Sequence, residues 1–124
     1  MAKLYAIGEA LIDFIPQTRD VELKDVKGFE PQVGGAPANV ASCVSRLGRE
    51  SALITQLGQD AFGDLIEETL QKQGVDTTSI SRTDEANTGL AFVSLTASGE
   101  RDFAFYRKPS ADMLLEASTL NLNF

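Results

Sequence analysis

Residues 34–41 read Gly-Gly-Ala-Pro-Ala-Asn-Val-Ala, two glycines followed by an alanine and then a proline. A proline in the first turn of a helix removes no intrahelical hydrogen bond, and glycine ahead of it lets the chain turn sharply. Apolar residues then recur at helical spacing before Gly48, at Val40, Ala41, Val44 and Leu47. The pattern predicts a glycine-rich turn that leads into a helix, with this apolar face buried.

Apolar runs on either side of this helix predict buried strands. Leu4–Gly8 is nearly continuous in apolar residues and ends in glycine, and Ala52–Leu57 is followed in the same way by Gly58. Such runs are typical of strands that are buried on both faces of a parallel sheet. The chain is therefore expected to build its first layer from these two strands.

A second helix is predicted directly after Gly58. Asp60 is a good N-cap, and apolar residues follow at helical spacing before Gly74, at Phe62, Leu65, Ile66 and Leu70. We expect Asp60 to cap this helix rather than to bind a ligand. The order strand, helix, strand, helix predicts an α/β fold with a right-handed parallel sheet flanked by helices.

Two further segments predict strands outside this layer. Residues 13–33 are more polar and are interrupted by proline and glycine, which predicts one or two solvent-facing strands. Gly89–Thr96 and Arg101–Arg107 are two β-rich runs joined by residues 97–100, which include a glycine. This arrangement predicts a β-hairpin.

The composition excludes several kinds of chemistry. The chain has 124 residues, no His, one Cys and a formal net charge of −7. Without His, neither a Ser-His-Asp arrangement nor a His-containing zinc site can form, and one Cys cannot make an intrachain disulfide. The negative charge disfavours nucleic acid and anionic membrane surfaces as partners, because both repel an acidic protein.

The length fits one domain or part of a larger one. No apolar run approaches the roughly 18–20 residues of a membrane span, and no signal-peptide pattern follows Met1, so a cytoplasmic protein is expected. Cys43 lies among small residues of the first predicted helix and is expected to be a packed thiol.

The glycine-rich turn is the strongest candidate for a ligand site. Gly34 and Gly35 allow a ligand to approach the backbone closely, and the free N–H groups at a helix start favour an electron-rich partner. Asn39 adds an amide that both donates and accepts hydrogen bonds, which suits a polyol. On these residues alone, a tight loop that merely feeds a helix remains the alternative.

Two charged residues are weaker candidates. Asp13 follows the first strand, where the ligands of open α/β sheets gather, and its carboxylate could accept two sugar hydroxyls. Arg107 shares one face of its strand with Phe103 and Phe105 by the period of two. The ordinary alternatives are a solvated or helix-capping carboxylate and a solvated edge-strand arginine.

The spacing from residues 34–41 through Gly48 to Gly58 resembles the N-terminal signature of the ribokinase/PfkB family of carbohydrate kinases. Gly58-Gln59-Asp60-Ala61-Phe62-Gly63 is similar to the family's Gly-x-Asp-x-x-Gly turn, and Gly8 to Asp13 looks like its first strand and sugar-contacting aspartate. Residues 105–115, Phe-Tyr-Arg-Lys-Pro-Ser-Ala-Asp-Met-Leu-Leu, are similar to the fructokinase branch. The resemblance covers the whole chain.

This resemblance implies a ribokinase-like fold, with a small β lid over the sugar, and ATP-dependent phosphorylation of a sugar such as fructose. It implies six substrate-binding residues, which are Asp13, Gly34, Gly35, Asn39, Phe105 and Arg107. ATP and Mg²⁺ are implied as cofactors, and a homodimer formed through the lid as the assembly. The lid strands would fall within about residues 14–33 and 89–107.

The family's second signature, a Gly-Ala-Gly-Asp-type segment that carries the catalytic base, has no match in residues 60–124. Residues 1–124 are therefore expected to be the N-terminal portion of a longer kinase domain, with no catalytic, nucleotide-binding or metal-binding residue of their own. A sheet with so few strands is expected to leave several apolar side chains without cover, at Leu53, Ile54, Phe62 and Ile66.

Two alternatives to a fructokinase-like activity stay open. Arg107 would equally pair a substrate carboxylate, so a kinase for 2-keto-3-deoxygluconate, or for another sugar or nucleoside, fits the same residues. A non-catalytic sugar-binding or dimerisation module would keep the lid and the glycine loop without phosphoryl transfer.

Overall fold

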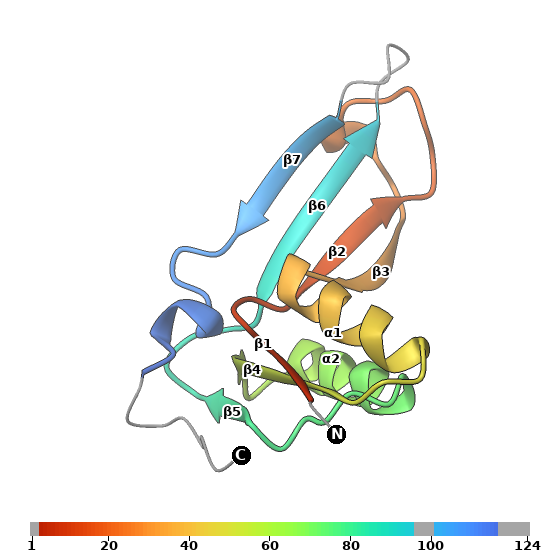
Figure 1. Cartoon of the computed structure of the whole chain (residues 1–124). Helices are drawn as coiled ribbons and strands as arrows, with labels where there is room; N and C mark the ends of the chain where they lie inside the picture. Colours follow the sequence, from red (N-terminus) through yellow and green to blue (C-terminus); the bar gives the residue numbers. More distant parts are fainter. Residues whose placement is uncertain (1–2, 96–100, 117–124) are drawn as a thin grey trace.

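The structure is a computed structural model that describes residues 3–95 and 101–116. The strands form two sheets (Figure 1). The first is parallel, in the order β1 (Leu4–Ile7), β4 (Ser51–Gly58), β5 (Ile80–Thr83). Both predicted strands are present, with β5 beside β4. Only β4 is buried throughout, and the prediction of burial was wrong for β1, an edge strand whose Leu4 and Ile7 are exposed.

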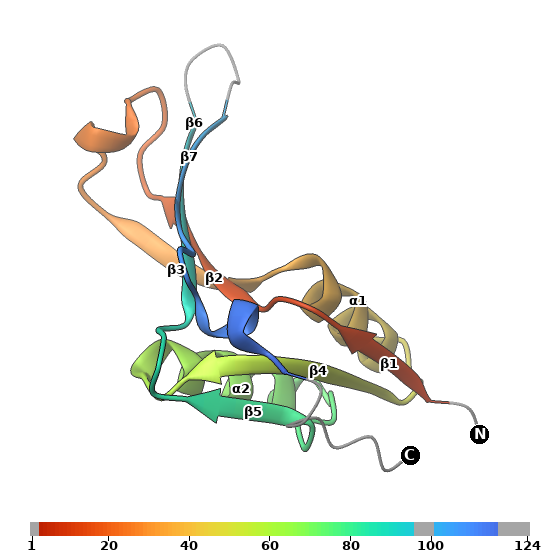
Figure 2. The ribbon, with the colours of Figure 1, turned by 90° about the vertical axis from the view of Figure 1, so that its left-hand side faces the viewer.

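The second sheet has the order β3 (Phe29–Gly34), β2 (Leu11–Pro16), β6 (Gly89–Leu95), β7 (Arg101–Tyr106). The central pair β2 and β6 is parallel, and the outer pairs are antiparallel. Figure 2 shows this sheet rising steeply from the parallel one. Both predicted hairpin strands are present, whereas the predicted turn at residues 97–100 lies outside the described residues. Residues 13–33 form strands as predicted, although β2 begins earlier, at Leu11.

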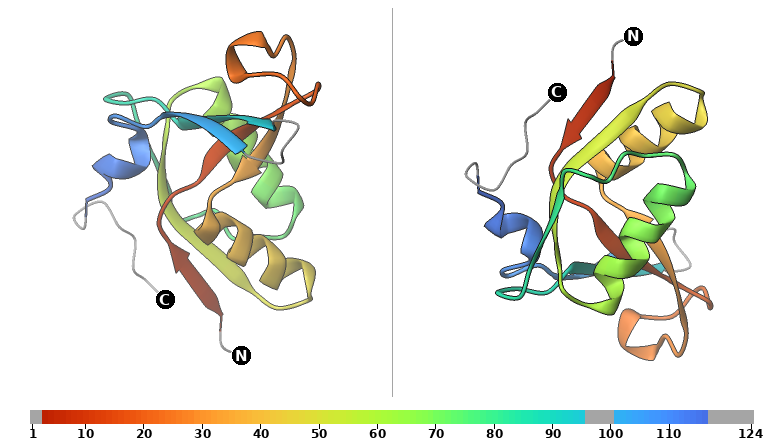
Figure 3. Two further views of the ribbon diagram at one scale, coloured as in Figure 1. Left: turned by 90° about the horizontal axis from the view of Figure 1, so that it is seen from above. Right: turned by 90° about the horizontal axis from the view of Figure 1, so that it is seen from below.

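Two helices, α1 (Ala36–Arg46) and α2 (Ala61–Lys72), pack against the same face of β4 (Figure 3). Side chains alternate between the two faces of a strand, and Leu53 and Leu57 lie on the face that the helices cover. They pack with both helices in one core. The core members that the helices supply are Ala38, Ala41, Ile66 and Leu70. This layer confirms the α/β fold class.

The opposite face of β4 is covered by η2 (Ala111–Leu114), a short 3₁₀ helix that follows the second sheet. Gln56 Nε2 donates a hydrogen bond to the Ala111 carbonyl oxygen over 2.9 Å. Ile54, on this face, is only 4% exposed. A second 3₁₀ helix, η1 (Leu23–Asp25), lies between β2 and β3.

The expectation of uncovered core side chains was wrong for the residues named. Leu53, Ile54 and Ile66 are buried, and Phe62 packs edge to face against Phe14 of β2 with ring centroids 5.5 Å apart. The reason is that the second sheet packs against α2 and that η2 packs against β4, so both cover the layer that these elements form. Exposed apolar side chains occur elsewhere, notably Ile7 at 57% and Leu47 at 78% exposure.

An aromatic cluster fastens the second sheet to α2. Phe14 stacks on Phe92 of β6 at 4.6 Å between centroids, and Phe29 meets both rings edge to face. Phe62 of α2 closes the cluster against Phe14. The strand period of two therefore turns Asp13, the residue before Phe14, to the opposite face of this sheet.

The predicted apolar face of α1 was only partly right. Ala38 and Ala41 are buried, whereas Val40 and Leu47 are exposed. Small side chains let the helix lie close to β1 and β4, and that orientation turns the larger ones outward. Cys43 is exposed as well, so the expected packed thiol was wrong. Within the described part of the chain, no helix is long and apolar enough to cross a membrane.

Candidate functional site

Asp13 lies within β2 rather than in a loop at the end of the first strand. Its backbone partners are Gln32 on β3 and Ala91 on β6, and Ala91 in turn pairs with Phe105 on β7. Residues paired across neighbouring strands point to the same side of a sheet. Asp13 and Phe105 therefore lie on one face of the second sheet, which we call the acidic face.

Arg107 comes one residue after Tyr106, the last residue of β7 and the partner of Leu90, so it lies level with Gly89. A β-carbon at position 89 would be 3.3 Å from Cγ of Arg107. Gly89 points to the same side as Ala91, two residues further along β6. The arginine stem therefore crosses the acidic face, which glycine at position 89 leaves open.

Gly34 completes this face. It pairs with Leu11, two residues before Asp13, and any side chain at position 34 would collide with the Asp13 carboxylate. The carboxylate thus lies against a bare Cα at the point where β3 leads to α1. The structure brings four of the six candidate residues to one sheet face, namely Asp13, Gly34, Phe105 and Arg107.

Gly35 has a structural task of its own. It is the N-cap of α1 with φ of +99°, a conformation that favours glycine. A β-carbon there would lie 2.7 Å from the backbone oxygen of Glu9. Because Gly35 has no side chain, the start of α1 can pack closely against the backbone of the segment that precedes β2.

The Asp13 carboxylate has no partner among the described residues: no hydrogen bond or ion pair there involves it. The side chain is half-buried, and burial raises its pKa above the usual 3.8. Burying a carboxylate without hydrogen bonds costs free energy, so the Asp13 carboxylate is suited to accept hydrogen bonds from a ligand.

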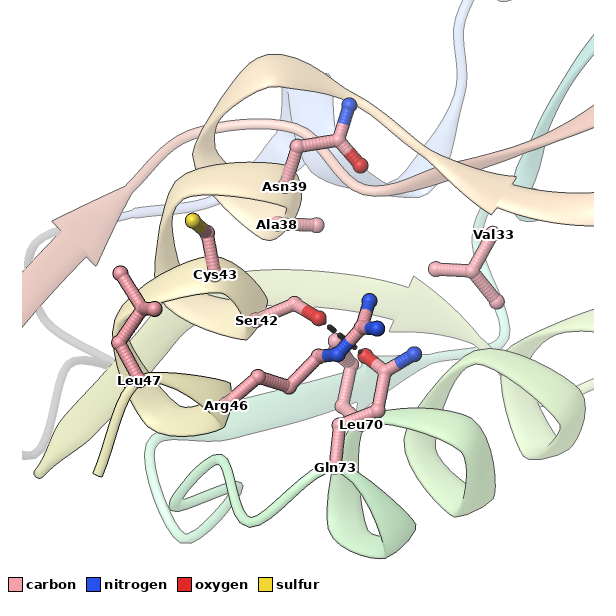
Figure 4. A pocket seen from close by; sticks show the side chains of 9 residues that line it. All are labelled: Val33, Ala38, Asn39, Ser42, Cys43, Arg46, Leu47, Leu70 and Gln73. Atoms are coloured by element: carbon pink, nitrogen blue, oxygen red, sulfur yellow. Dashed lines mark hydrogen bonds between the residues drawn. The ribbon is translucent and has the colours of Figure 1, made fainter. Parts of the chain in front are cut away.

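Asn39 lies in the first turn of α1 and is exposed, with its backbone N–H donating to the Gly35 carbonyl oxygen. It borders a cavity of about 580 Å³ between α1 and α2, where Ser42 Oγ donates to Gln73 Oε1 over 2.5 Å. Figure 4 shows the Asn39 amide directed away from that hydrogen bond. Neither Asp13 nor Gly34 lines this cavity. The cavity that Asn39 borders is therefore separate from the Asp13 carboxylate.

Phe105 and Arg107 also line a second cavity, of about 720 Å³, beside the loop of residues 84–88. Phe105 is exposed and stacks on Phe103, with 5.5 Å between ring centroids. The pair forms an apolar ledge on the edge strand β7, and Asp13 does not line this cavity.

The sequence reasoning assigned no role to Asp112, which the structure places against Arg107. One Asp112 oxygen lies 2.6 Å from a terminal nitrogen of Arg107, and Ser110 Oγ donates to the other oxygen over 2.5 Å. Nε of Arg107 is buried, with no partner in the part of the chain that the structure describes. The available signal was the five-residue spacing of Arg107 and Asp112 within residues 105–115.

Asp60 caps α2, as predicted, with Oδ1 accepting from the Gly63 N–H over 2.8 Å. It faces Thr88, not the acidic face. Across residues 3–95 and 101–116, no three acidic, His or Cys side chains gather as metal ligands would.

Curated proteins resemble this chain closely. "Probable fructokinase-3" of Arabidopsis thaliana is 50% identical over 119 residues, which is 96% of this chain and 34% of the relative. "Fructokinase-2" of Solanum lycopersicum is 49% identical over 97% of this chain and 37% of its own length. The chain thus spans about a third of the length of the curated relatives it matches.

Solved structures share the fold. A fructokinase from Xylella fastidiosa superposes with a TM-score of 0.86 at 44% identity, over 96% of this chain and 36% of that one. The same enzyme with bound ATP gives 0.85 at 42% identity, over 96% and 37%. A structure described as "a putative Ribokinase II" from E. coli gives 0.91 at 34% identity, over 98% and 39%. The fold is therefore ribokinase-like.

The profile of the family described as "pfkB family carbohydrate kinase" matches residues 1–123, nearly the whole chain. Relatives that are about 50% identical and solved structures with the same fold agree with this match. The chain belongs to the pfkB family of carbohydrate kinases.

Proposed function

We propose that the complete protein carrying this chain is an ATP-dependent kinase that phosphorylates a primary hydroxyl of fructose. One observation carries the proposal: the Asp13 carboxylate, which has no partner among the described residues, lies against Gly34 on the sheet face that also bears Phe105 and Arg107. Carboxylate, guanidinium and backbone beside an aromatic ring suit a polyol. The relatives named fructokinases support the same substrate class.

In this proposal each residue binds rather than reacts. Asp13 accepts hydrogen bonds from two sugar hydroxyls, and Gly34 lets the sugar approach the backbone. Asn39 and the first-turn N–H groups of α1 hold a further hydroxyl, with Gly35 fixing the helix start. Phe105 covers one side of the ring, and the exposed part of the Arg107 guanidinium donates to the substrate.

The second sheet acts as a lid in this proposal, and residues 1–124 form the N-terminal, sugar-binding portion of the kinase domain. A lid matters for phosphoryl transfer because water would otherwise compete with the sugar hydroxyl. ATP, which supplies the phosphoryl group in the presence of Mg²⁺, would bind to segments outside this chain, in the cytoplasm. The described residues therefore orient the acceptor only.

The test is fructose-dependent release of ADP by the complete protein supplied with ATP and Mg²⁺. We expect activity in the complete protein and none in isolated residues 1–124, because the family's second signature is absent from them. A complete protein that binds fructose without releasing ADP would favour the non-catalytic module. One that does neither would refute the proposal.

We further propose a homodimer formed through the lid. Phe103 and Phe105 are 45% and 59% exposed on one edge strand, and an apolar edge of this kind suits a second copy of the same sheet. Phe103→Ser should shift sedimentation of the complete protein toward the monomer. An unchanged dimer in that variant would argue against a lid contact.

A further inference from the structure

We propose that Asp112 makes the site prefer an uncharged sugar to a sugar acid as the phosphoryl acceptor, because its carboxylate neutralises the charge of Arg107. The inference rests on the proposed sugar kinase function and adds a specificity-determining residue to it. It concerns a side chain that lies behind the arginine, not one that touches the substrate.

The first step is geometric. Asp112 holds a terminal nitrogen of Arg107 at 2.6 Å, and the Asp112 side chain is only 8% exposed while that of Arg107 is 27% exposed. Ser110, itself buried, fixes the other Asp112 oxygen from the opposite side. The Ala111 N–H donates to the Asn87 carbonyl oxygen over 2.8 Å, which anchors this turn to the loop before β6. Asp112 is therefore held in place whether or not a ligand is bound.

The second step is the charge that a ligand meets. An ion pair shielded from water is weakly screened, so the carboxylate of Asp112 offsets most of the field of the guanidinium. The Asp13 carboxylate, on the same sheet face, adds a negative charge with no partner in the described residues. With two carboxylates to one guanidinium, these three side chains together are net negative. Lys108 is exposed to solvent, where its charge is screened.

The third step is what remains of Arg107 for recognition. The Arg107 side chain keeps 27% of its surface exposed, so its guanidinium still offers hydrogen-bond donors that a ligand can reach. A hydroxyl or ketone oxygen can accept one such hydrogen bond at no electrostatic cost. A carboxylate would need the bidentate fork, one arm of which Asp112 already occupies, and would also meet the repulsion of Asp13 and Asp112.

The experiment compares two acceptors, fructose and 2-keto-3-deoxygluconate, in the complete protein with ATP. The measured quantity is the ratio of kcat/KM for fructose to kcat/KM for the sugar acid. Asp112→Asn keeps the shape and removes the charge, and we expect it to lower this ratio at least tenfold, chiefly by improving KM for the acid.

Two control variants separate charge from structure. Ser110→Ala loosens Asp112 without changing its charge, so it should alter both substrates by the same factor and leave the ratio within twofold. Asp102→Asn removes an equal charge from exposed positions of β7 and should leave the ratio unchanged. An equal loss for both substrates in Asp112→Asn would reduce Asp112 to a structural residue and overturn the inference.

A measurement on the unmodified protein tests the inference should Asp112→Asn fail to fold. Inhibition of fructose phosphorylation by 2-keto-3-deoxygluconate should be at least tenfold weaker than inhibition by a neutral ketose, sorbose. Stronger inhibition by the acid would overturn the inference while leaving a sugar kinase in place. Absence of any phosphorylation of fructose would instead refute the proposed function, and the inference with it.

Discussion

Asp60 binds Thr88 through both oxygens of its carboxylate. Oδ2 accepts the Thr88 backbone N–H over 2.9 Å, and Oδ1 accepts the Thr88 hydroxyl over 2.8 Å. Burial alone would raise the pKa of Asp60, but these hydrogen bonds, one from Gly63 and the charge of Arg82 bring it below 3.8. The start of α2 is thereby tied to the residue that precedes β6 of the second sheet.

Thr88→Val should destabilise the complete protein by about 1–3 kcal/mol, the usual cost of leaving buried polar groups unpaired. The Thr88 hydroxyl donates to Asp60 and accepts from the Gly58 N–H over 3.0 Å, and valine can do neither. Thr88→Ser is the matched control, because it keeps the hydroxyl and loses one methyl, worth about 0.8 kcal/mol. Urea unfolding measures both. Equal losses in the two variants would mean that the hydrogen bonds contribute nothing.

Asp13→Asn should weaken fructose binding by about 1–3 kcal/mol, the value of hydrogen bonds to a charged group. The same variant should unfold at an equal or higher temperature. Burial raises the folded-state pKa of Asp13 above 3.8, so the native state binds more protons than the unfolded state between these two values, and stability falls as pH rises through that window. Asparagine removes this penalty at neutral pH.

Calorimetry with fructose and a thermal melt without it measure the two effects of Asp13→Asn. Asp102→Asn is the control, since Asp102 pairs with Ser94 and so points away from the acidic face. Unchanged affinity for fructose in Asp13→Asn would remove Asp13 from the binding site.

Gly35→Ala should cost more stability than Gly48→Ala. Both glycines have positive φ, +99° and +91°, so both variants bear the backbone strain of about 1 kcal/mol. Only position 35 adds a collision, 2.7 Å from the Glu9 backbone oxygen, whereas position 48 is open to solvent. We expect the free energy of unfolding to fall by at least about 1 kcal/mol more in Gly35→Ala, as overpacking implies. Equal costs would show that the backbone at Glu9 simply moves aside.

The ion pair between Lys3 and Asp76 should make stability depend on acid pH. The hydrogen bond from Lys3, followed by those from Thr78, lowers the pKa of Asp76 to about 2, and the pair raises the pKa of Lys3 above 10.5. The folded-state pKa of Asp76 lies below the unfolded value of 3.8, so its contribution is present above 3.8 and is lost as pH falls through about 2.

Because Lys3 and Asp76 side chains are 25% and 30% exposed, solvent screening leaves a contribution of about 1 kcal/mol. Asp76→Asn should therefore destabilise the complete protein at neutral pH, with the difference from the unmodified protein disappearing toward pH 2. Denaturation curves at a series of pH values measure it. A difference independent of pH would assign the effect to packing rather than charge.

The amino-acid sequence by itself determined the local elements. The apolar runs before Gly8 and Gly58, the turn at Gly34 and Gly35, and the Asp60 cap all depend on residues within a few positions of one another. Backbone sterics and the periods of helix and strand govern such features, so a pattern in the sequence is enough to predict them. The six candidate site residues could also be named from the sequence, because its resemblance to a known family spans the whole chain.

Only the tertiary structure decided which of these residues meet. Asp13 and Ala91 are neighbours because β2 pairs in parallel with β6, and no local pattern specifies a partner so far along the chain. Close packing of α1 on its sheet decides which face of the helix is buried. Small side chains permit that packing, so Ala38 and Ala41 are buried and Val40 and Leu47 are exposed. The Asp112 partner of Arg107 likewise emerges from the turn that Asn87 anchors. Such contacts depend on the free energy of the whole packed arrangement, to which side chains distant in sequence contribute together.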